Sequence, residues 1–482
     1  MLERINVFLW SVPVLGLILG TGVWLTGITG FAQVRLFPAA WRDFLRRLRS
    51  RDSGFRALCT ALAATVGTGN IAGVAGAIAI GGPGAVLWMW VSAFLGMAVK
   101  CAESVLAVRY REPDGRAGPM YIIRKGLPRR WHWLAWVYCF FGIVAAFGVG
   151  NATQVNAVLS SLELAGGGNL RIVLGLVLAV VVAVMVMGGA KSICSVAEVL
   201  VPVVSGGYIL LCAAALVLRW DRLGEAMGQI LLGAFDPGAV TGGVVGGMMT
   251  TLRLGVSRGT FTNEAGMGTA AIAHGTAETV RPVDQGLMGI MEVFLDTMVI
   301  CTLTALVILT GGIPIPYGTA AGAELTAAAL AARFGVWVHG ALCACLVLFA
   351  LATILGWGFY AGRCAEYLFG SVNWKVFGLC QGAGVLLGVF LETGTVWTLA
   401  EIVNGLMALP NLAAVLALSA EVRSLLFVDR SCRSMVSSLR GDTNEKEKHS
   451  GPPAGRDPAV GLSGGPCAGN HGAAPERLHR RR

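Results

Sequence analysis

The sequence predicts an all-α membrane protein with about eleven transmembrane helices, built as two inverted halves behind one extra N-terminal helix. Three observations predict this. Of the 482 residues, 55% are hydrophobic and only 13% are charged, so the chain has more apolar surface than a soluble protein of this length can bury. Apolar runs of about 20 residues, long enough to cross a membrane as helices, recur from end to end. Two glycine-rich segments, 64–84 and 240–276, interrupt such runs at corresponding places, as in inverted-repeat transporters.

Eleven apolar segments meet the length criterion for a spanning helix. They are 7–30, 57–80, 83–108, 132–160, 171–189, 194–218, 240–258, 284–310, 337–362, 374–392 and 396–419. None alternates as barrel strands do. The first segment lacks a small-residue cleavage site and is too long for the apolar core of a signal peptide, so we expect it to remain as a span.

The spans divide into an N-terminal helix and two sets of five. We expect residues 1–31 to form the extra helix, 57–218 the first five-helix repeat and 240–419 the second. An odd number of spans in each repeat gives the two repeats opposite topology. Residues 429–482 are polar, rich in glycine and proline and without periodicity, which predicts a disordered cytoplasmic tail.

Lysine and arginine are unevenly distributed over the connections. Connections 31–56 and 109–131 carry seven basic residues each, whereas 163–170 and 311–336 carry almost none. Two spans separate the basic connections, so both lie on one side, and the positive-inside rule makes that side cytoplasmic. We therefore expect an integral protein of a bacterial plasma (inner) membrane, with the N-terminus outside and the C-terminus inside.

Other function classes fit the sequence poorly. The net charge of +10 lies in membrane-flanking segments without a nucleic-acid-binding motif, so lipids rather than nucleic acids are the expected surroundings. The twelve cysteines are scattered without a C-x-x-C pair, which predicts no disulfide framework or metal site. The six histidines lie far apart and no hydrolase motif is present, so we expect neither an enzyme nor a cofactor.

The segment 64–84, ATVGTGNIAGVAGAIAIGGPG, combines an apolar span with helix-breaking residues. Within a membrane, a helix break is tolerated only where it lines a cavity or is buried in protein. A break exposes N–H groups that attract anions and C=O groups that coordinate cations. Gly67 and Gly69 relax the backbone there, and Thr68 and Asn70 add polar side chains. The alternative is that Gly69 and Gly73 simply permit close helix packing.

Several longer blocks are distinctive as a set. They are GTGNIAGVAGAIAIGGPGAVLWMW (67–90), GPMYIIRKGL (118–127), GNATQVNA (150–157), SRGTFTNEAGMGTA (257–270), VFLDTMVICTLTALVIL (293–309), TILGWGFYAGRCAEYLFG (353–370) and NGLMALPN (404–411). Through them the chain from about residue 5 to 425 resembles the alanine/glycine:cation symporter family. The resemblance implies a LeuT-type fold of ten core helices plus one extra span, and uptake of alanine or glycine with sodium, sometimes with protons. It does not extend to the tail after 429.

The resemblance and the predicted break together imply a binding site for a small neutral amino acid. The implied substrate-binding residues are Thr68, Gly69, Asn70, Gly73, Gln154 and Trp357. Backbone N–H groups at the break would hold the substrate carboxylate, and carbonyls of 244–261 would accept from its ammonium group. The LeuT-type pattern implies a sodium site formed by carbonyls near Thr65, Val66 and Gly69 and by the Thr353 hydroxyl. The alternative for Thr353 is a hydrogen bond to its own helix.

Four further polar residues are candidates for gating or structural roles: Asn263, Glu264, Asp296 and Asn404. Asn263 and Glu264 would form either an inner gate with Arg253 or Arg258, or a capped turn. Asp296 would pair with an arginine, cap a broken helix or relay a proton, and it shares a helix face with Glu292, four residues before it. Asn404 would stabilise a helix interruption near Pro410, or pack.

Four other charged residues, Lys100, Glu103, Glu198 and Glu366, lie near the ends of predicted spans. We expect their side chains to snorkel to the membrane surface. The sequence as a whole predicts a secondary active transporter that takes up alanine or glycine with sodium by alternating access. The alternatives are a proton-coupled symporter of another small neutral amino acid, a channel, and a non-transporting amino-acid receptor.

Overall fold

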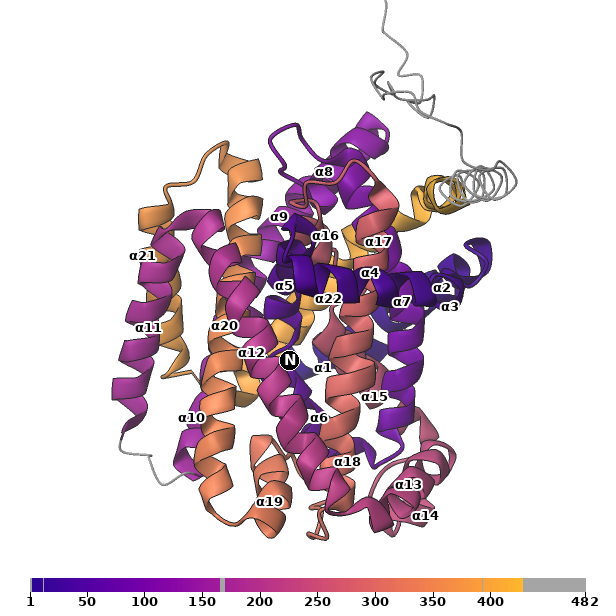
Figure 1. The fold of residues 1–482 in the computed structure, drawn as a ribbon, viewed down its shortest axis with the longest axis vertical. Coiled ribbons are helices and arrows are strands. Elements are labelled where there is room, and N and C mark those ends of the chain that lie inside the picture. Colours follow the sequence, from indigo (N-terminus) through magenta and orange to yellow (C-terminus); the bar gives the residue numbers. More distant parts are fainter. Residues whose placement is uncertain (1, 12, 165–169, 392, 428–482) are drawn as a thin grey trace, which may run out of the picture. The chain divides into compact units, whose positions relative to one another are not determined.

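The computed structural model describes residues 2–11, 13–164, 170–391 and 393–427, and every regular element within these ranges is helical (Figure 1). The chain divides into two compact units, Met1–Arg423 and Ser424–Arg482. All the helices described below belong to the first unit. The predicted tail, 429–482, lies outside the described residues.

Helices of the first part of the chain alternate between long spans and short connecting elements. They are α1 (Leu2–Ser11), α2 (Pro13–Ile28), α3 (Ala32–Arg35), α4 (Phe37–Ser50), α5 (Ser53–Thr65), η1 (Thr68–Asn70), α6 (Ala72–Gly81), α7 (Ala85–Tyr110), α8 (Pro119–Gly126), η2 (Arg129–Trp131), α9 (Trp133–Ala145), η3 (Ala146–Ala152), α10 (Thr153–Leu164), α11 (Arg171–Met187) and α12 (Gly189–Val217). Of these, η3 is a π-helix that joins α9 to α10.

The second part of the chain repeats this alternation. Its elements are η5 (Trp220–Arg222), α13 (Leu223–Phe235), α14 (Pro237–Thr241), α15 (Met248–Asn263), α16 (Thr269–His274), α17 (Pro282–Val293), η6 (Phe294–Cys301), α18 (Thr302–Thr310), α19 (Ala323–Phe334), α20 (Trp337–Phe369), α21 (Trp374–Gly388) and α22 (Thr393–Ala417). A second π-helix, η6, joins α17 to α18. α22 runs without interruption through Pro410, so of the two alternatives for Asn404 the helix interruption near Pro410 is wrong.

Among the described residues, seven helices are long and apolar enough to cross a membrane without a sharp bend. They are Arg4–Ile28, Ala85–Tyr110, Arg129–Glu163, Gly189–Val217, Pro282–Thr310, Trp337–Phe369 and Gly394–Ala417. An eighth consists of Ser53–Thr65 and Thr68–Gly81, which meet at an angle of 61°. The helix therefore breaks inside the segment where the sequence predicts a break.

The first break has local causes. The Asp52 side chain accepts a hydrogen bond from Phe55 N at 2.9 Å and caps the start of α5. Val66 and Gly67 are extended, so the helix stops after Thr65. Asn70 Oδ1 then accepts from Gly67 N at 2.9 Å, which holds the chain in the turn that restarts the helix.

The second break lies further along the chain than the sequence indicates. Residues 240–247 form the end of α14 and a turn, and α15 continues to Asn263, so the predicted span 240–258 has the wrong boundaries. Glu264 ends α15 in the left-handed region, with φ of 54°. Gly266 and Gly268 follow with φ of 93° and 76°, which glycine adopts without strain, and α16 begins directly after them.

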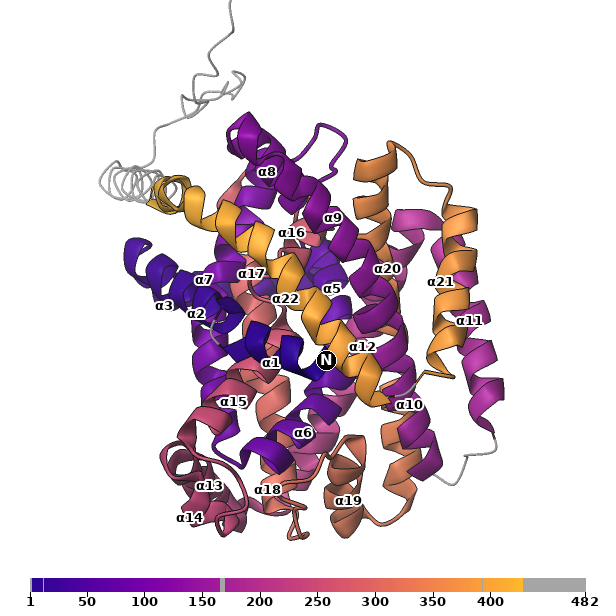
Figure 2. The same ribbon diagram turned by 180° about the vertical axis from the view of Figure 1, so that it is seen from behind.

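Small residues allow the helices around the breaks to pack closely. α7 packs against both α15 and α17, and a Cβ atom on Gly255 would collide with the Ala85 carbonyl. A buried cluster next to this contact consists largely of alanine, valine and isoleucine from α6, α7 and α18. Close backbone approach of this kind stabilises helix contacts in membranes, where lipid is as apolar as the protein. Figure 2 shows α22 crossing the bundle beside α1.

Candidate functional site

The first break lies against α20. A Cβ atom on Gly67 would collide with Thr353 Oγ1, so glycine is required for this close approach. The Thr353 hydroxyl is buried and has no hydrogen-bond partner among the described residues, and the alternative bond to its own helix does not form. The carbonyls that end α5, near Thr65 and Val66, have no following helical turn to bond with. An unpartnered hydroxyl beside free carbonyls suits a cation.

Thr68 faces α10 across the break. Its hydroxyl donates to Gln154 Oε1 at 2.8 Å, and both side chains are buried. Trp357 lies one helical turn after Thr353 and packs its side chain against Gly150 and the ring of Tyr360. The indole N–H of Trp357 is buried without a partner among the described residues.

Asn70 joins the two breaks through Asp296. Asn70 Nδ2 donates to Asp296 Oδ1 at 2.6 Å, and Thr297 Oγ1 donates to Asp296 Oδ2 at 2.7 Å. From the second break, Asn263 Nδ2 donates to Thr297 Oγ1 at 3.2 Å. Gly69 lies against Thr262 near the end of α15. The π-helix η6 thus holds both breaks through one buried carboxyl group.

A cavity of about 470 Å³ lies on the α19 side of the first break. Its lining includes Gly73 on α6, Asn156 on α10 and Glu324 on α19. Arg258 also lines it, with its guanidinium 3.1 Å from Glu401 and 5.4 Å from the ring centre of Trp397. Gly73 therefore faces open space, whereas Gly69 and Asn70 lie in the packed region next to the break.

The predicted pairing of Asn263 or Glu264 with an arginine is wrong. Glu264 accepts from Thr269 Oγ1 at 2.6 Å, and Asn263 Oδ1 accepts from Ala265 N at 3.0 Å. Arg258 pairs with Glu401 instead. Asn263 and Glu264 instead form a buried, hydrogen-bonded turn. They do so because the helix break lies at 264–268 rather than at the end of a span.

A buried charge cluster connects α7, α16 and α17. Lys100 Nζ lies 3.1 Å from Glu292 Oε1, and His274 Nε2 lies 2.9 Å from Glu292 Oε2. His274 Nδ1 lies 2.8 Å from Gln285 Oε1. All four side chains are fully buried. Each oxygen of the Glu292 carboxylate therefore has its own partner, Lys100 for Oε1 and His274 for Oε2.

Glu103 accepts hydrogen bonds from the second break. Its Oε1 accepts from Gly266 N and Gly268 N, each at 3.1 Å, and from Asn411 Nδ2 at 2.5 Å. The predicted snorkelling of Lys100 and Glu103 is therefore wrong, because both point into the bundle. Glu198 and Glu366 pair with arginines instead, with Arg56 at 2.8 Å and Arg363 at 2.7 Å.

Sequence reasoning missed this cluster, although a signal was present. Lys100 and Glu103 lie three residues apart within the predicted span 83–108, not beyond it. Residues at this spacing share one helix face, and intramembrane charges usually face protein partners. The Asn404 side chain is also fully buried, and neither of its polar atoms is bonded to a described residue.

Known proteins resemble this chain over most of its length. The model of the sodium:alanine symporter family matches residues 1–430. A protein of Haemophilus influenzae described as an uncharacterized transporter is 42% identical over 429 residues, which cover 86% of this chain and 93% of that protein. The sodium/alanine symporter AgcS of Methanococcus maripaludis is 40% identical over 441 residues, which cover 88% and 95%.

A solved structure provides the comparison of the fold. The crystal structure of MhsT in complex with L-phenylalanine matches with a TM-score of 0.55 at 16% identity, over 77% of this chain and 97% of that one. At this level of identity the likeness concerns the fold alone. It confirms the predicted LeuT-type fold.

Proposed function

The chain belongs to the sodium:alanine symporter family, and from this premise we propose that it takes up alanine or glycine together with sodium by alternating access. Membership of the family makes it a cation-coupled amino-acid transporter of a membrane. One observation carries the finer proposal. At the 61° break, the orphaned hydroxyl of Thr353 lies directly against Gly67, where a coupling cation finds oxygen ligands and no competing hydrogen bond.

The substrate would lie between the two breaks. The N–H groups of Thr68 and Gly69 begin the half-helix and have no intrahelical acceptor, so they suit a carboxylate. The substrate ammonium group would bind carbonyls at the end of α15, near Phe261 and Thr262, which lie beside Gly69. The sequence predicted ammonium-binding carbonyls anywhere in 244–261. The proposal keeps only those at the end of α15, because 244–247 precedes α15 at the opposite end of this helix. Gln154 would orient the site through Thr68, with Trp357 packed behind it.

Access to this site has a proposed direction. α8 lies at one end of the bundle and α13, α14 and α19 lie at the other, with α4 crossing nearer the α8 end (Figure 1). The positive-inside rule makes the α4 end cytoplasmic, with the N-terminus outside. The cavity near Gly73 then opens toward the outside. The Arg258–Glu401 pair would gate it.

The test of this function is uptake of labelled alanine and glycine into proteoliposomes that contain the full chain. The three conditions are an inward sodium gradient, an inward proton gradient and neither. Accumulation that requires sodium supports the proposal. Binding without accumulation would support a receptor, and flux without coupling to a gradient would support a channel.

Replacing Thr353 by alanine is expected to lower the apparent sodium affinity of uptake. A polar contact to a charged partner contributes about 1.5–3 kcal/mol, which corresponds to roughly a 10-fold to 100-fold loss of affinity. Sodium dependence of the initial uptake rate measures this. The Thr353→Ser variant keeps the hydroxyl and should retain most of the affinity. If T353A has the sodium dependence of the parent protein, Thr353 is not a ligand.

Proton coupling is the second candidate, and one observation favours it. Asp296 is fully buried and hydrogen-bonded, but it forms no ion pair with a described residue. Ionisable groups buried inside membrane spans often mark proton pathways. If uptake responds to the proton gradient and the Asp296→Asn variant loses that response while still binding alanine, Asp296 carries the proton.

A further inference from the structure

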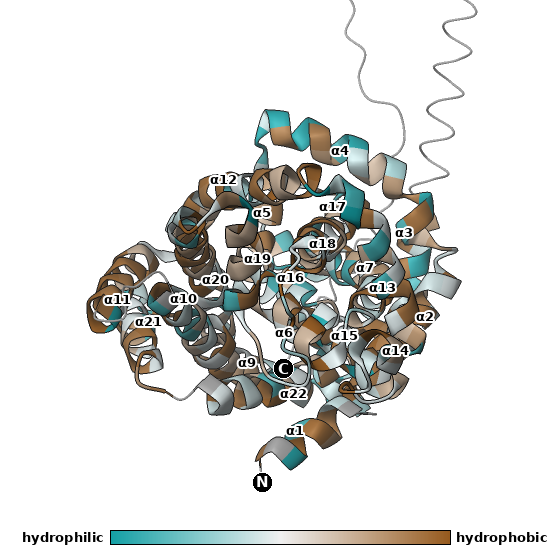
Figure 3. Cartoon of the chain, turned by 90° about the horizontal axis from the view of Figure 1, so that it is seen from below, coloured by the Kyte–Doolittle hydropathy of each residue, from teal (hydrophilic) through white to brown (hydrophobic). Residues whose placement is uncertain are grey.

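Helix α4 lies across the spanning helices at the rim of the bundle. Figure 1 shows it crossing in front of α17, and Figure 3, a view along the spans, shows it at the outer edge with hydrophilic and hydrophobic residues alternating. Pro38 stands in its first turn, and the helix ends at Arg51 in the left-handed region. A helix in this orientation meets the membrane surface rather than crossing it.

One side of α4 is fixed to the transport bundle. Arg47 is only 5% exposed; its Nε donates to Asp43 at 2.7 Å and its Nη1 to Asp52 at 3.0 Å. Asp52 caps α5, the first half of the broken helix. The Phe37 ring packs edge-on against Phe294, with centroids 4.9 Å apart. Phe294 begins η6, so α4 contacts α5 and η6, two of the elements that form the candidate site.

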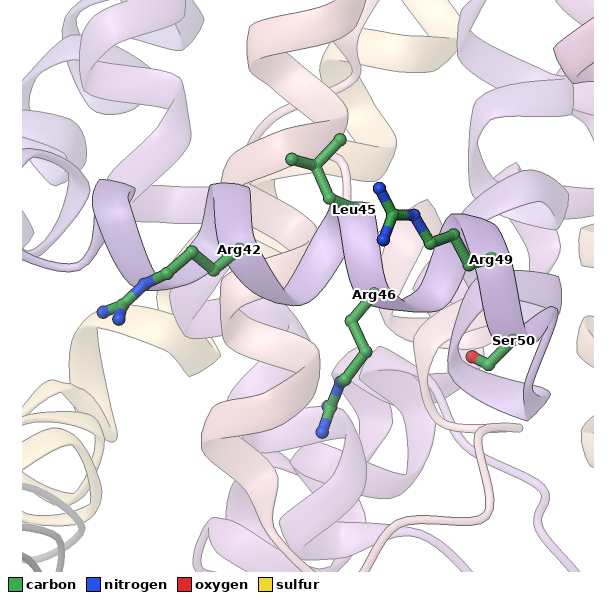
Figure 4. Close-up of a pocket in the computed structure, with 5 residues that line it drawn as sticks. All are labelled: Arg42, Leu45, Arg46, Arg49 and Ser50. Atoms are coloured by element: carbon green, nitrogen blue, oxygen red, sulfur yellow. The ribbon is translucent and has the colours of Figure 1, made fainter.

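The outward side of α4 carries two stripes at helical spacing. Trp41, Leu45 and Leu48 form an apolar stripe and are 40%, 39% and 41% exposed. Arg42, Arg46 and Arg49 form a basic stripe beside it. Figure 4 shows Leu45 and Arg46 projecting from opposite edges of the helix. The three arginines, with Leu45 and Ser50, line an open hollow of about 520 Å³.

The basic stripe has little to bind within the protein. Among the described residues, Arg42 donates only to Pro38 O of its own helix, at 3.2 Å, and Arg46 pairs with Asp43 of the same helix. Arg49 has no hydrogen bond or ion pair with any residue that the structure describes. Within the described part of the chain, these three guanidinium groups on one exposed helix side therefore have one carboxylate partner, Asp43.

We propose that α4 is a docking helix for anionic phospholipids, with Arg42, Arg46 and Arg49 on lipid phosphates and Trp41, Leu45 and Leu48 on the adjoining acyl chains. The rim position places bilayer, not protein, against the outward side. Charge complementarity selects the phosphate of an anionic lipid, because arginine matches phosphate geometry and amphipathic basic helices bind such surfaces. The exposed apolar stripe favours a ligand with an apolar part, such as an acyl chain, which a soluble anion lacks.

Lipid bound at α4 acts on transport through the contacts to Asp52 and Phe294. A lipid that holds α4 also fixes the start of α5 and the start of η6, which leads to Asp296. Uptake is therefore expected to require anionic lipid. This second step rests on the proposed function, whereas lipid binding does not.

The experiment compares two double variants of the full chain, R42Q/R49Q on α4 and R129Q/R130Q on η2. Both remove two exposed arginines from basic connections, and neither removes an ion pair described here. The binding readout is phosphatidylglycerol retained on the purified protein, measured by mass spectrometry. We expect R42Q/R49Q to retain roughly tenfold less lipid, R129Q/R130Q to retain nearly the parental amount, and R42K/R49K to recover most of it.

The transport readout is alanine uptake in phosphatidylcholine vesicles with and without phosphatidylglycerol. Uptake by the parent protein should rise with phosphatidylglycerol, and that of R42Q/R49Q should not. Equal lipid loss in both double variants would show that lipid retention depends on the net charge of the protein and not on α4. That result would overturn the proposal. Recovery of uptake by inorganic phosphate in pure phosphatidylcholine would assign the site to a soluble anion and also overturn it. Lipid retention that follows α4 without uptake in any vesicle would support the docking helix and contradict the proposed transport function.

Discussion

Replacing Asn70 by alanine is expected to lower the initial rate of alanine uptake by roughly 100-fold. The side chain makes four buried hydrogen bonds, and the two shortest run from Gly67 N to its Oδ1 and from its Nδ2 to Asp296 Oδ1. Their loss leaves a backbone N–H and a carboxyl oxygen without partners inside the bundle, at about 1–3 kcal/mol each, and about 2.7 kcal/mol is a factor of 100. Uptake into proteoliposomes at saturating sodium measures the effect.

The matched control is Asn151→Ala. Asn151 is equally buried, and its Nδ2 donates to Gln381 Oε1 at 2.9 Å, but it lies in η3 against α21 and contacts neither break. N151A should cost some stability and keep uptake within a few-fold of the parent. If N70A and N151A transport alike at equal amounts of folded protein, the joint between the breaks does not determine transport.

Replacing Lys100 by methionine is expected to destabilise the protein by about 3–5 kcal/mol. The change leaves the Glu292 carboxylate buried with only His274 beside it, and an uncompensated buried charge is more costly than the lost attraction alone. Thermal unfolding of the purified protein in detergent measures this, together with the amount of protein that reaches the membrane.

Two further variants separate charge compensation from packing. K100M/E292M removes both charges and should recover most of the stability, because apolar replacements of a buried ion pair are often neutral. Lys191→Met changes an exposed lysine on α12 and should shift stability by less than about 0.5 kcal/mol. If K100M is no less stable than K191M, the Lys100–Glu292 pair does not hold the bundle together.

Sequence patterns predicted the local features of this fold. Apolar length predicted the spans, because membrane thickness sets it, and the residues Thr-Gly-Asn at 68–70 predicted a break, because these residues interrupt a helix and supply polar groups. The second break was placed less well. Its glycines at 242 and 243 also have positive φ and end only a short connecting helix, so composition could not distinguish them from Gly266 and Gly268.

Contacts between distant segments were beyond the sequence. Lys100 lies near the end of a predicted span, which favours snorkelling for an isolated helix. Only the packing of α7 against α17 brings Glu292 within reach of it. The same holds for Thr353, whose hydroxyl lies against Gly67 of a distant segment and has no partner among the described residues. Single-sequence reasoning identifies which residues are polar, whereas tertiary packing decides which of them remain unpaired.

The carboxylate of Glu103 has a consequence for selectivity. Because it already accepts from Gly266 N and Gly268 N, these two amide hydrogens of the second break are not free to bind an incoming acid. An amino acid with one carboxylate can still bind that carboxylate at the N–H groups of the first break. Aspartate or glutamate would bring a second negative charge toward Asp296 and Glu103 without a donor to receive it, and the repulsion inside a low-dielectric interior would be severe. We therefore expect dicarboxylic amino acids neither to be carried nor to compete with alanine.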